Sequence, residues 1–477
     1  MTTTVIRNSD WIVAFDAGSR GHRYVSGDVA FANDKLIHVG GKFAGPADRE
    51  IDGRGFMVMP GLVNIHSHPA SEPLNKGWND EAGSAKLYNS SLYEIMPIFR
   101  PDKQGVAPSF RVALCEALMS GVTTLVDLSV AHEGWVALMA ASGMRGVLGP
   151  MYRSARWYTR NGHVVEYEWD EAAGRRAMDE ALRVIAAAQQ HPSGRLSGMV
   201  IPSQIDTCSA ELFRDSYAES LRLKVPFQTH AAQSIVEFHE MTRRHGMTPI
   251  EWLDSLGVLG PTSIIGHGIF LDHHSAAHWP KRDDLKTIID RGVTVAHCPT
   301  VFIRRGITMQ TVGGYIRRGV KIAIGTDTYP HNMIEEMRHA LYASRIVARD
   351  VFDLRTRDIF NAATLGGAAA LQRDDIGRLA VGAKADIVLV DVTAPSMRPV
   401  RDPIQSLIYQ AADRAVRHVF VDGAQVVADG RVTTMDYAAA ALELEETQRR
   451  VEPMVRELDW AHRSHEELSP LVYRRAH

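Results

Sequence analysis

Two histidines stand one residue apart at the end of an apolar run, MPGLVNIHSH, which covers residues 59–68. Side chains of a β-strand alternate between its two faces, so His66 and His68 would point to one side and Ser67 to the other. Two neighbouring imidazoles are well suited to bind a metal ion, although a pair of hydrogen-bonded structural histidines fits the spacing equally well. The choice depends on what else converges on this strand end.

Three more polar residues lie in apolar, strand-like runs: His230 in VPFQTHAA, His267 in SIIGHGIF and Asp327 in KIAIGTD. Each alone is explained as well by a buried histidine or a capping aspartate. Together with the first pair they form a set of nitrogen and oxygen ligands that suits Zn²⁺ or Fe²⁺ and leaves a position open for water. Because a divalent metal lowers the pKa of bound water from 15.7 to about 7, the sequence predicts a hydrolytic metal centre.

The elements that would bring these residues together are eight apolar runs, separated by helix-compatible stretches such as FRVALCEALMSG. The runs have the continuous apolar character of parallel strands that are buried on both faces. Eight such units predict a (β/α)8 TIM-like barrel, in which the strand ends converge on one opening. The runs cover residues 61–68, 122–128, 145–152, 196–204, 225–232, 263–270, 293–300 and 321–327.

The flanking segments have a different pattern. Short β-type runs broken by glycine, aspartate and asparagine occupy residues 1–60 and return at residues 376–435. We therefore expect an α/β protein in which these two segments form one composite β-sandwich domain and a catalytic barrel domain, residues 61–375, is inserted between them. Residues 436–477 are rich in helix formers and predict a C-terminal helical tail.

Composition narrows the functional class. The 477-residue chain has 53 basic and 56 acidic side chains and a formal net charge of −3, which gives no electrostatic reason to expect nucleic acid or an anionic membrane as partner. Three cysteines are too few for a disulfide framework, and no run approaches the ~20 apolar residues of a membrane span. With no signal-peptide pattern at the start, we expect a cytoplasmic protein that acts on a small molecule.

Several motifs resemble, in order and spacing, the amidohydrolase superfamily, in the branch that contains triazine chlorohydrolases and deaminases of triazines, guanine and cytosine. The motifs are PGLVNIHSH, GVTTLVD, THAA, GHG, VAHCPT, GTD and the closing IGRLAVGAKADIVLVD, and they span nearly the whole chain. The resemblance implies that the metal ligands are His66, His68, His230 and Asp327, and that His267 lies beside the bound water or the substrate.

The resemblance also bears on the number of metal ions and on proton transfer. Relatives with two metal ions carry a bridging lysine or glutamate on strand four, but residues 196–204, LSGMVIPSQ, contain neither. We therefore expect one divalent ion per subunit, with zinc ahead of iron, manganese or cobalt. Asp327 would accept a proton from water and pass it to the leaving group, and His267 would polarise the atom on which charge builds. For His267, a merely orienting role is the alternative.

Two departures from the branch pattern concern the substrate. Relatives that attack heteroaromatic rings resemble H-x-x-E after strand five, but here the glutamate position is Gln233, whose amide cannot hand over a proton at neutral pH. Val301 and Phe302 stand where Ser-Asn commonly follows the motif HCPT, which predicts an apolar pocket wall.

These departures favour hydrolysis of a C–N bond, or a related C–S or C–O bond, in a small apolar amide, urea, carbamate or thiocarbamate. The alternative is an aminohydrolase or chlorohydrolase of a nitrogen heterocycle such as a triazine or pyrimidine. A non-catalytic scaffold is a minor alternative, and the intact set of expected ligands argues against it.

Weaker signals surround the expected centre. The long segment after the first run could cover the pocket with Trp78, Tyr88 and Tyr93, although packing on the rim explains these aromatic residues equally well. His297 and His331 could face the opening, and for His297 a structural role is favoured.

Two adjacent arginines and the oligomeric state complete the expectations. Arg304 and Arg305 could hold an anionic group, and a solvated surface pair is the default alternative. The C-terminal helices and the family resemblance favour a homodimer or a larger homo-oligomer.

Overall fold

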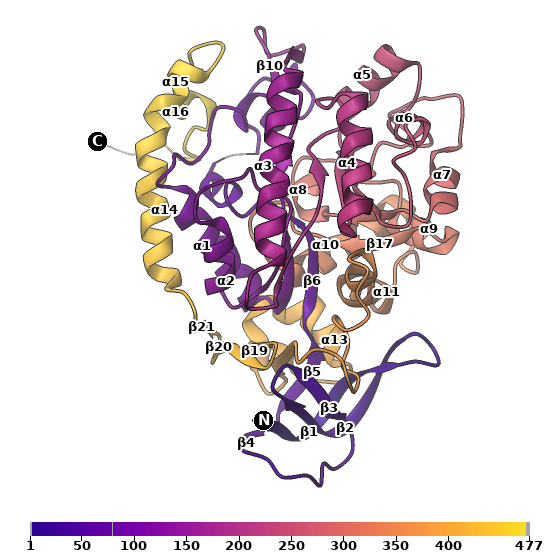
Figure 1. Ribbon diagram of the computed structural model, residues 1–477, viewed down its shortest axis with the longest axis vertical. Helices are drawn as coiled ribbons and strands as arrows, with labels where there is room; N and C mark the ends of the chain where they lie inside the picture. The colour runs from indigo at the N-terminus through magenta and orange to yellow at the C-terminus, as the bar shows by residue number, and fades with distance from the viewer. Residues whose placement is uncertain (1, 79, 474–477) are drawn as a thin grey trace.

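The computed structural model describes residues 2–78 and 80–473 of the chain. One mixed sheet lies at one end of the molecule, and two parallel sheets surrounded by helices lie beside it (Figure 1). The α/β class expected from the sequence is therefore confirmed.

The mixed sheet, at the lower end of Figure 1, takes strands from two distant parts of the chain. β5 from the N-terminal part pairs antiparallel with β18 from the C-terminal part, with Met59 opposite Val388. The strand order is β21-β20-β19-β18-β5-β1-β2-β3, and β4 pairs with β1. The strands are β1 (Thr3–Asp16), β2 (Gly21–Ala32), β3 (Lys35–Val39), β4 (Arg49–Asp52), β5 (Phe56–Pro60), β18 (Ile387–Asp391), β19 (Val416–Val421), β20 (Ala424–Ala428) and β21 (Arg431–Val432).

This sheet curls upon itself. Phe31 in β2 and Phe420 in β19 have ring centroids 5.7 Å apart, although β1, β5 and β18 lie between their strands. In a flat sheet, four strand spacings would separate them by about 19 Å. The inner face encloses a small apolar core that includes Ile12, Val58 and Leu389. The sequence predicts a sandwich, whereas the ladder is one continuous sheet whose curvature brings its two ends face to face.

The eight apolar runs of the central segment all contain strands. They form two four-stranded parallel sheets, in the orders β12-β8-β7-β6 and β14-β15-β16-β17, with a short pair of β9 and β13. The strands are β6 (Leu62–Ser67), β7 (Val122–Asp127), β8 (Arg145–Leu148), β9 (Met151–Tyr152), β12 (Leu196–Gly198), β13 (Ile201–Pro202), β14 (Phe227–Ala231), β15 (Ser263–His267), β16 (Thr294–His297) and β17 (Lys321–Ile324). A separate hairpin pairs β10 (Ala155–Tyr158) with β11 (Glu166–Trp169).

Isolated bridges link the two parallel sheets at both edges. Ser67 at the end of β6 bridges to Asp327 beyond β17, and Gln204 beyond β13 bridges to His230 in β14. The ladders are thus two four-stranded sheets joined by single bridges rather than one continuous eight-stranded ladder. One bridge brings the carboxyl ends of β6 and β17 together, and the other brings β14 beside the segment after β13.

Amphipathic helices cover these sheets. In α3, the buried residues Met178, Ala181, Ile185 and Ala188 recur at spacings of three and four residues, which places them on one face, and Asp170 caps the first turn. None of the helices within residues 2–78 and 80–473 combines the length and apolar character that a bilayer crossing requires. The main helices are α1 (Val106–Met119), α2 (Trp135–Ala141), α3 (Glu171–Gln189), α4 (Ala210–Leu223), α5 (Ile235–His245), α6 (Pro249–Ser255), α7 (Asp284–Arg291), α8 (Pro299–Ile303), α9 (Val312–Arg318), α10 (Met333–Ala348), α11 (Thr356–Asn361), α12 (Gly367–Ala370) and α13 (Pro403–Ser406).

The long segment between β6 and α1 is held by the C-terminal helices, which are α14 (Tyr437–Val451), α15 (Val455–Leu458) and α16 (His465–Leu468). α14 lies beside α1 at the edge of the molecule (Figure 1). Gln448 in α14 donates to the backbone oxygens of Leu74, at 2.7 Å, and Lys76, at 2.9 Å. The expected helical tail is thus packed against the segment that follows the first strand, and its residues 474–477 lie outside the described residues.

A buried ion pair fastens the parallel sheets to the terminal sheet. Arg145 in β8 donates to both carboxylate oxygens of Asp386, at 3.1 and 3.2 Å, and also contacts Asp422.

We expect Arg145→Met to lower the free energy of unfolding by about 3–5 kcal/mol, because two carboxylates lose their counter-charge in a buried site. Denaturant unfolding would measure the loss. The matched control is Arg156→Met, since Arg156 pairs with Glu168 on the surface and should cost at most about 1 kcal/mol; equal losses would contradict the prediction.

Candidate metal centre

His66 and His68 project from the end of β6 to the same side. Their ring centroids are 5.3 Å apart, and the hydroxyl of Ser67 points away to donate to the backbone oxygen of Val126 at 2.7 Å. This is the alternation that a strand imposes on consecutive side chains. The pair is therefore presented together at a strand end.

Three further polar side chains from other strand ends meet this pair. His68 Nε2 lies 3.3 Å from His230 Nε2 and 3.2 Å from Asp327 Oδ1. The same carboxylate oxygen is 3.6 Å from His66 Nε2, and Oδ2 is 3.7 Å from His267 Nε2. Ligand atoms around a tetrahedral zinc ion lie about 3.3–3.4 Å apart, because zinc–nitrogen and zinc–oxygen bonds are about 2.0–2.1 Å long. The spacings are in the range for ligands of one metal ion, and two overlapping triads, His66–His230–His267 and His66–His68–Asp327, each have ligand atoms within 4.8 Å of one another.

Oxygen atoms outside the cluster fix which nitrogen carries the hydrogen in three of the imidazoles. Each Nδ1 lies within hydrogen-bond distance of a carbonyl or amide oxygen, which can only accept, so Nδ1 carries the hydrogen and Nε2 of the neutral ring has the lone pair. For His68, burial lowers the pKa but the Asp327 carboxylate outweighs it and raises the pKa above its usual value. The lone pairs then face one another with the Asp327 carboxylate beside them, an arrangement that is repulsive unless a cation lies between them. The pairs are His66 with Gln228 Oε1 at 2.6 Å, His68 with the Leu128 oxygen at 2.6 Å, and His230 with the Ser203 oxygen at 2.7 Å.

Burial and charge act in opposite senses on the carboxylate. Burial alone would raise the pKa of Asp327, but the surrounding imidazoles, His267 first, outweigh it and hold the pKa well below its usual range. Burial, reinforced by the neighbouring His66 and His68, lowers the pKa of His230 well below its usual value. An ionised aspartate and a neutral histidine are the forms in which both groups bind metal.

Close packing around His66 requires glycine at two positions. A Cβ on Gly266 would lie 2.6 Å from His66 Cε1, and a Cβ on Gly325 would lie 2.5 Å from His66 Cβ. Asp327 itself has a left-handed backbone, with φ of 59°, which is uncommon for a residue with a side chain. Two hydrogen bonds hold it there, from its own N–H to the His66 oxygen and from the His68 N–H to its oxygen.

His267 lies between the candidate ligands and an apolar wall. Its ring is 4.7 Å from that of His66 and 4.6 Å from that of Phe302 in α8, and its Nδ1 is buried with no partner among the described residues. Val301, the neighbour of Phe302, is buried in the main apolar core. Of the two residues that the sequence assigns to the pocket wall, Phe302 is thus the one that contacts the centre.

Gln233 lies three residues beyond His230, in the turn before α5. The side chain is buried, and its Nε2 has no hydrogen-bond partner within the described part of the chain. Glu237 in α5 fixes the turn, because its carboxylate accepts from the backbone N–H of Ala232 at 2.6 Å. The buried amide also lies near the Glu237 carboxyl, whose pKa it lowers against the larger opposing effect of burial.

The three aromatic residues of the long segment pack mainly with other parts of the chain. Trp78 stacks on Phe99 with centroids 3.8 Å apart, and Tyr93 is buried edge-to-face against Trp157 at 5.2 Å. Tyr88 is half exposed, and its ring meets Phe270 beyond β15 at 6.1 Å. These contacts account for all three without a ligand.

Two further histidines are buried near strand ends. Burial lowers the pKa of His297 to about 3, and its Nε2 has no partner among the described residues. His331 is buried with Nδ1 3.9 Å from Glu116 Oε2, and burial lowers its pKa as well. Neither imidazole makes a hydrogen bond or ring contact with the five clustered side chains in the described structure.

Two residues beside the clustered side chains were not predicted from the sequence. Gln228, which orients His66, lies two residues before His230 on the same strand face, so strand alternation was a usable signal. Glu72 is buried four residues beyond His68, within electrostatic range of His68 and Asp327, and burial raises its pKa. No sequence pattern distinguishes Glu72 from the other acidic residues of its segment.

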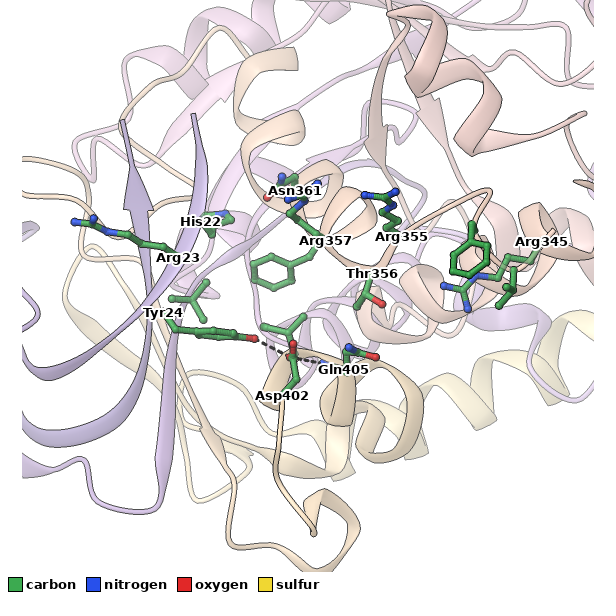
Figure 2. A pocket seen from close by; sticks show the side chains of 15 residues that line it. His22, Arg23, Tyr24, Arg345, Arg355, Thr356, Arg357, Asn361, Asp402 and Gln405 are labelled. Atoms are coloured by element: carbon green, nitrogen blue, oxygen red, sulfur yellow. Dashed lines mark hydrogen bonds between the residues drawn. The ribbon is translucent and has the colours of Figure 1, made fainter. Parts of the chain in front are cut away.

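A separate cavity of about 480 Å³ lies at the junction of the mixed sheet with α11 and α13. Figure 2 shows Tyr24 and Asp402 facing each other across it, where the tyrosine hydroxyl donates to the carboxylate at 2.8 Å. His22 and Asn361 also line it. None of the residues that the sequence assigns to catalysis, metal or substrate lines this cavity.

Comparison with known proteins adds a relative and two solved structures. The chain is 30% identical over 415 residues to a 5-methylthioadenosine/S-adenosylhomocysteine deaminase of Natronomonas pharaonis, covering 86% of this chain and 90% of the relative. An adenosine deaminase from Xanthomonas campestris with bound zinc has a TM-score of 0.79 at 23% identity, covering 94% of this chain and 98% of that one. The atrazine chlorohydrolase of Arthrobacter aurescens TC1, complexed with zinc, has a TM-score of 0.78 at 21% identity and coverages of 93% and 100%.

A family model gives the broadest of these matches. The model of the amidohydrolase family matches residues 57–426, which is well over half of the chain and includes every clustered histidine and Asp327. The resemblance identified from the sequence motifs is confirmed, and so is the expectation of a hydrolase that acts on C–N bonds other than peptide bonds. The chain belongs to the amidohydrolase family.

Proposed function

We propose that the protein is a metal-dependent aminohydrolase that releases ammonia from a nitrogen heterocycle of the adenosine type. The observation that carries the proposal is the clustering of oriented imidazoles with a carboxylate, in which two overlapping triads, His66–His230–His267 and His66–His68–Asp327, each have ligand atoms within 4.8 Å of one another. The deaminase relative, aligned over 90% of its length, supports the substrate class over the amide or urea that the sequence favours.

In this proposal, one zinc ion is held by His66, His68, His230 and Asp327. The donor set of nitrogen and oxygen atoms suits zinc, and the zinc-containing solved structures of the same fold support the choice. His66 Nε2 is buried with no hydrogen-bond partner among the described residues, as a ligand atom must be. When bound, a divalent ion supplies a water molecule of lowered pKa as the nucleophile.

The chain's own residues would move the protons. Asp327 has a carboxylate oxygen, Oδ2, that faces His267 rather than the other imidazoles, so it is free to accept a proton and return it to the leaving amine. His267 would hydrogen-bond the substrate atom on which negative charge builds, because its ring stands between the ligand set and Phe302. Phe302 would exclude water from that side of the substrate.

Gln233 would turn its Nε2 from the neighbouring Glu237 carboxyl to donate a hydrogen bond to a ring nitrogen of the heterocycle. Such a bond polarises the ring without delivering a proton. The same residue favours a second candidate function, hydrolysis of an amide, urea, carbamate or thiocarbamate, because those substrates need only a polarised carbonyl and no ring protonation. The two functions use the same metal centre and differ in the role of the Gln233 side chain.

The finer architecture is part of the proposal. We infer that the eight parallel strands form a (β/α)8 barrel over residues 61–375, with residues 1–60 and 376–435 as the second domain and 436–477 as the tail. The bridges between the two parallel sheets support this organisation. Trp78, Tyr88, Tyr93, His297, Val301 and His331 stay predictions as substrate contacts, as do a homo-oligomeric state and a cytoplasmic location.

The first prediction concerns metal affinity. We expect Gln228→Leu to weaken zinc binding by about 10- to 100-fold, because His66 loses the acceptor that fixes its tautomer. Competition with a chromogenic chelator would measure the affinity. Gln190→Leu, at an exposed position after α3, is the matched control and should bind zinc like the wild type. Equal affinities for both variants would show that Gln228 has no part in the centre.

The second prediction is ammonia release. Zinc-loaded protein should deaminate 5′-deoxyadenosine or 5′-methylthioadenosine, which a coupled ammonia assay and the change in the ultraviolet spectrum of the base would detect. Removal of zinc with a chelator should abolish the activity, and zinc should restore it. If the same preparation cleaves phenylureas or anilides and leaves the adenosines intact, the second candidate function takes the place of the first.

The third prediction separates the two functions by substitution. Gln233→Glu should raise kcat for the adenosines by at least about tenfold, because a carboxylic acid can transfer a proton to the ring, and general acids typically contribute about 10²–10⁴-fold. Burial at this position would help to keep the new group protonated, because Gln233 is only 4% exposed. For an amide or urea the same change should bring no gain. Steady-state kinetics of both substrate classes decide the outcome, and a gain on ureas alone would contradict the assigned role.

A further inference from the structure

Arg304 and Arg305 lie at the edge of the metal centre. They follow α8 directly, two and three residues beyond Phe302, whose ring contacts His267. Arg304 Nη1 donates to the backbone oxygen of Tyr329 at 3.1 Å, and the guanidinium lies 4.6 Å from the centroid of the Tyr329 ring. Tyr329 is two residues beyond Asp327, so two independent connections place the arginine pair beside the candidate ligands.

The pair is not a solvated surface feature, which is the default expectation for adjacent arginines. The side chains are only 23% and 19% exposed. The buried atoms include Nε and Nη2 of Arg304 and Nε of Arg305, and none of the three has a hydrogen-bond partner in the described structure. Leaving buried guanidinium donors unsatisfied is costly, because a charged group loses its water without compensation.

The charged groups around the pair do not satisfy it. Asp80 forms ion pairs with both arginines, at 3.2 Å from Arg304 and 3.8 Å from Arg305, but without hydrogen-bond geometry. Glu72 and Glu336 lie within electrostatic range of the pair, but neither forms an ion pair or a hydrogen bond with it among the described residues. Asp80 is thus the carboxylate that pairs with the two guanidiniums. The two guanidiniums therefore keep a net positive charge and N–H donors without an acceptor among the described residues.

We propose that Arg304 and Arg305 bind a carboxylate, or an anionic group of similar shape, on the substrate whose reacting carbon lies at the metal centre. The planar guanidinium fork matches a carboxylate and supplies the missing acceptors. The proposal rests on the proposed function only in placing the substrate at that centre, and it adds that the substrate is an acid. Asp80 occupies the position of this group until substrate displaces it.

A purely structural role is the competing explanation. The arginines would then serve to hold the segment after β6 in place through Asp80. That role affects every substrate alike, because it acts on the pocket as a whole. Recognition of an anion instead strengthens the binding of an acid and not of its neutral amide analogue. The readout is therefore the ratio of kcat/KM, or of affinity, between the acid and the amide.

The experiment uses zinc-loaded protein and matched acids and amides. The first pair is the 5′-carboxylic acid and 5′-carboxamide of adenosine, and the second is 4-ureidobenzoate and 4-ureidobenzamide. For each pair, kcat/KM and the affinity from isothermal titration calorimetry are measured for the wild type, Arg304→Gln and Arg305→Gln. We expect the wild type to prefer the acid of at least one pair by about tenfold or more, and either substitution to remove most of that preference. Arg318→Gln, at an exposed position in α9, is the control and should keep the wild-type ratio.

Asp80→Asn is the second test of the same idea. Removing the competing carboxylate should raise the preference for the acid above that of the wild type, whereas loss of a structural lock would lower both affinities and keep their ratio. The proposal is overturned if the wild type binds acid and amide equally in both pairs, or if the arginine variants keep the wild-type ratio. Failure of the proposed deaminase function is a separate result. It would appear as intact adenosines, while calorimetry and the urea pair would still decide whether an anion is bound.

Discussion

Three imidazole lone pairs and a carboxylate can share one small volume only with a cation among them. Each of the three tautomers is fixed by an oxygen outside the cluster, and those oxygens belong to Leu128 after β7, Ser203 after β13 and Gln228 within β14. Two of them are backbone carbonyls just beyond the end of a strand, and the Ser203 oxygen also accepts from the backbone N–H of His230 at 3.0 Å. The end of a parallel sheet thus supplies both the ligands and the acceptors that orient them.

The same constraint explains the backbone around the cluster. His66 lies where the ends of β6, β15 and β17 approach one another, and side chains at Gly266 or Gly325 would occupy its place. Asp327 reaches the cluster from a left-handed backbone that costs about 1–3 kcal/mol, which its two hydrogen bonds to β6 and its electrostatic pairing with the imidazoles offset. The strain is local and lies at the residue that approaches three of the clustered histidines.

The sequence was informative wherever a residue acts through regular structure. Strand alternation predicted that His66 and His68 face one way, and the run pattern placed His230, His267 and Asp327 at strand ends, which the structure brings together. It could not predict that Trp78 and Tyr93 pack with Phe99 and Trp157, because those contacts depend on how an irregular segment folds on itself and meets a distant part of the chain. The curvature of the terminal sheet could not be predicted from the sequence for a similar reason. Alternating burial is the same in a sandwich and in one sheet whose ends meet.

The side chains proposed to bind the metal lie apart from those proposed to select the substrate. The clustered ligands lie at strand ends, whereas Gln233, Phe302 and the two arginines lie in the turns and short helices beyond them, where sequence can change without disturbing the sheet. Charge links the two sets. A divalent ion held by neutral imidazoles and one carboxylate would keep one net positive charge, which the negative charge of the nucleophile would cancel. Such a neutral centre would offer an acid little attraction. Binding an acid would therefore require cationic groups outside the ligand set, which is the role proposed for the two arginines.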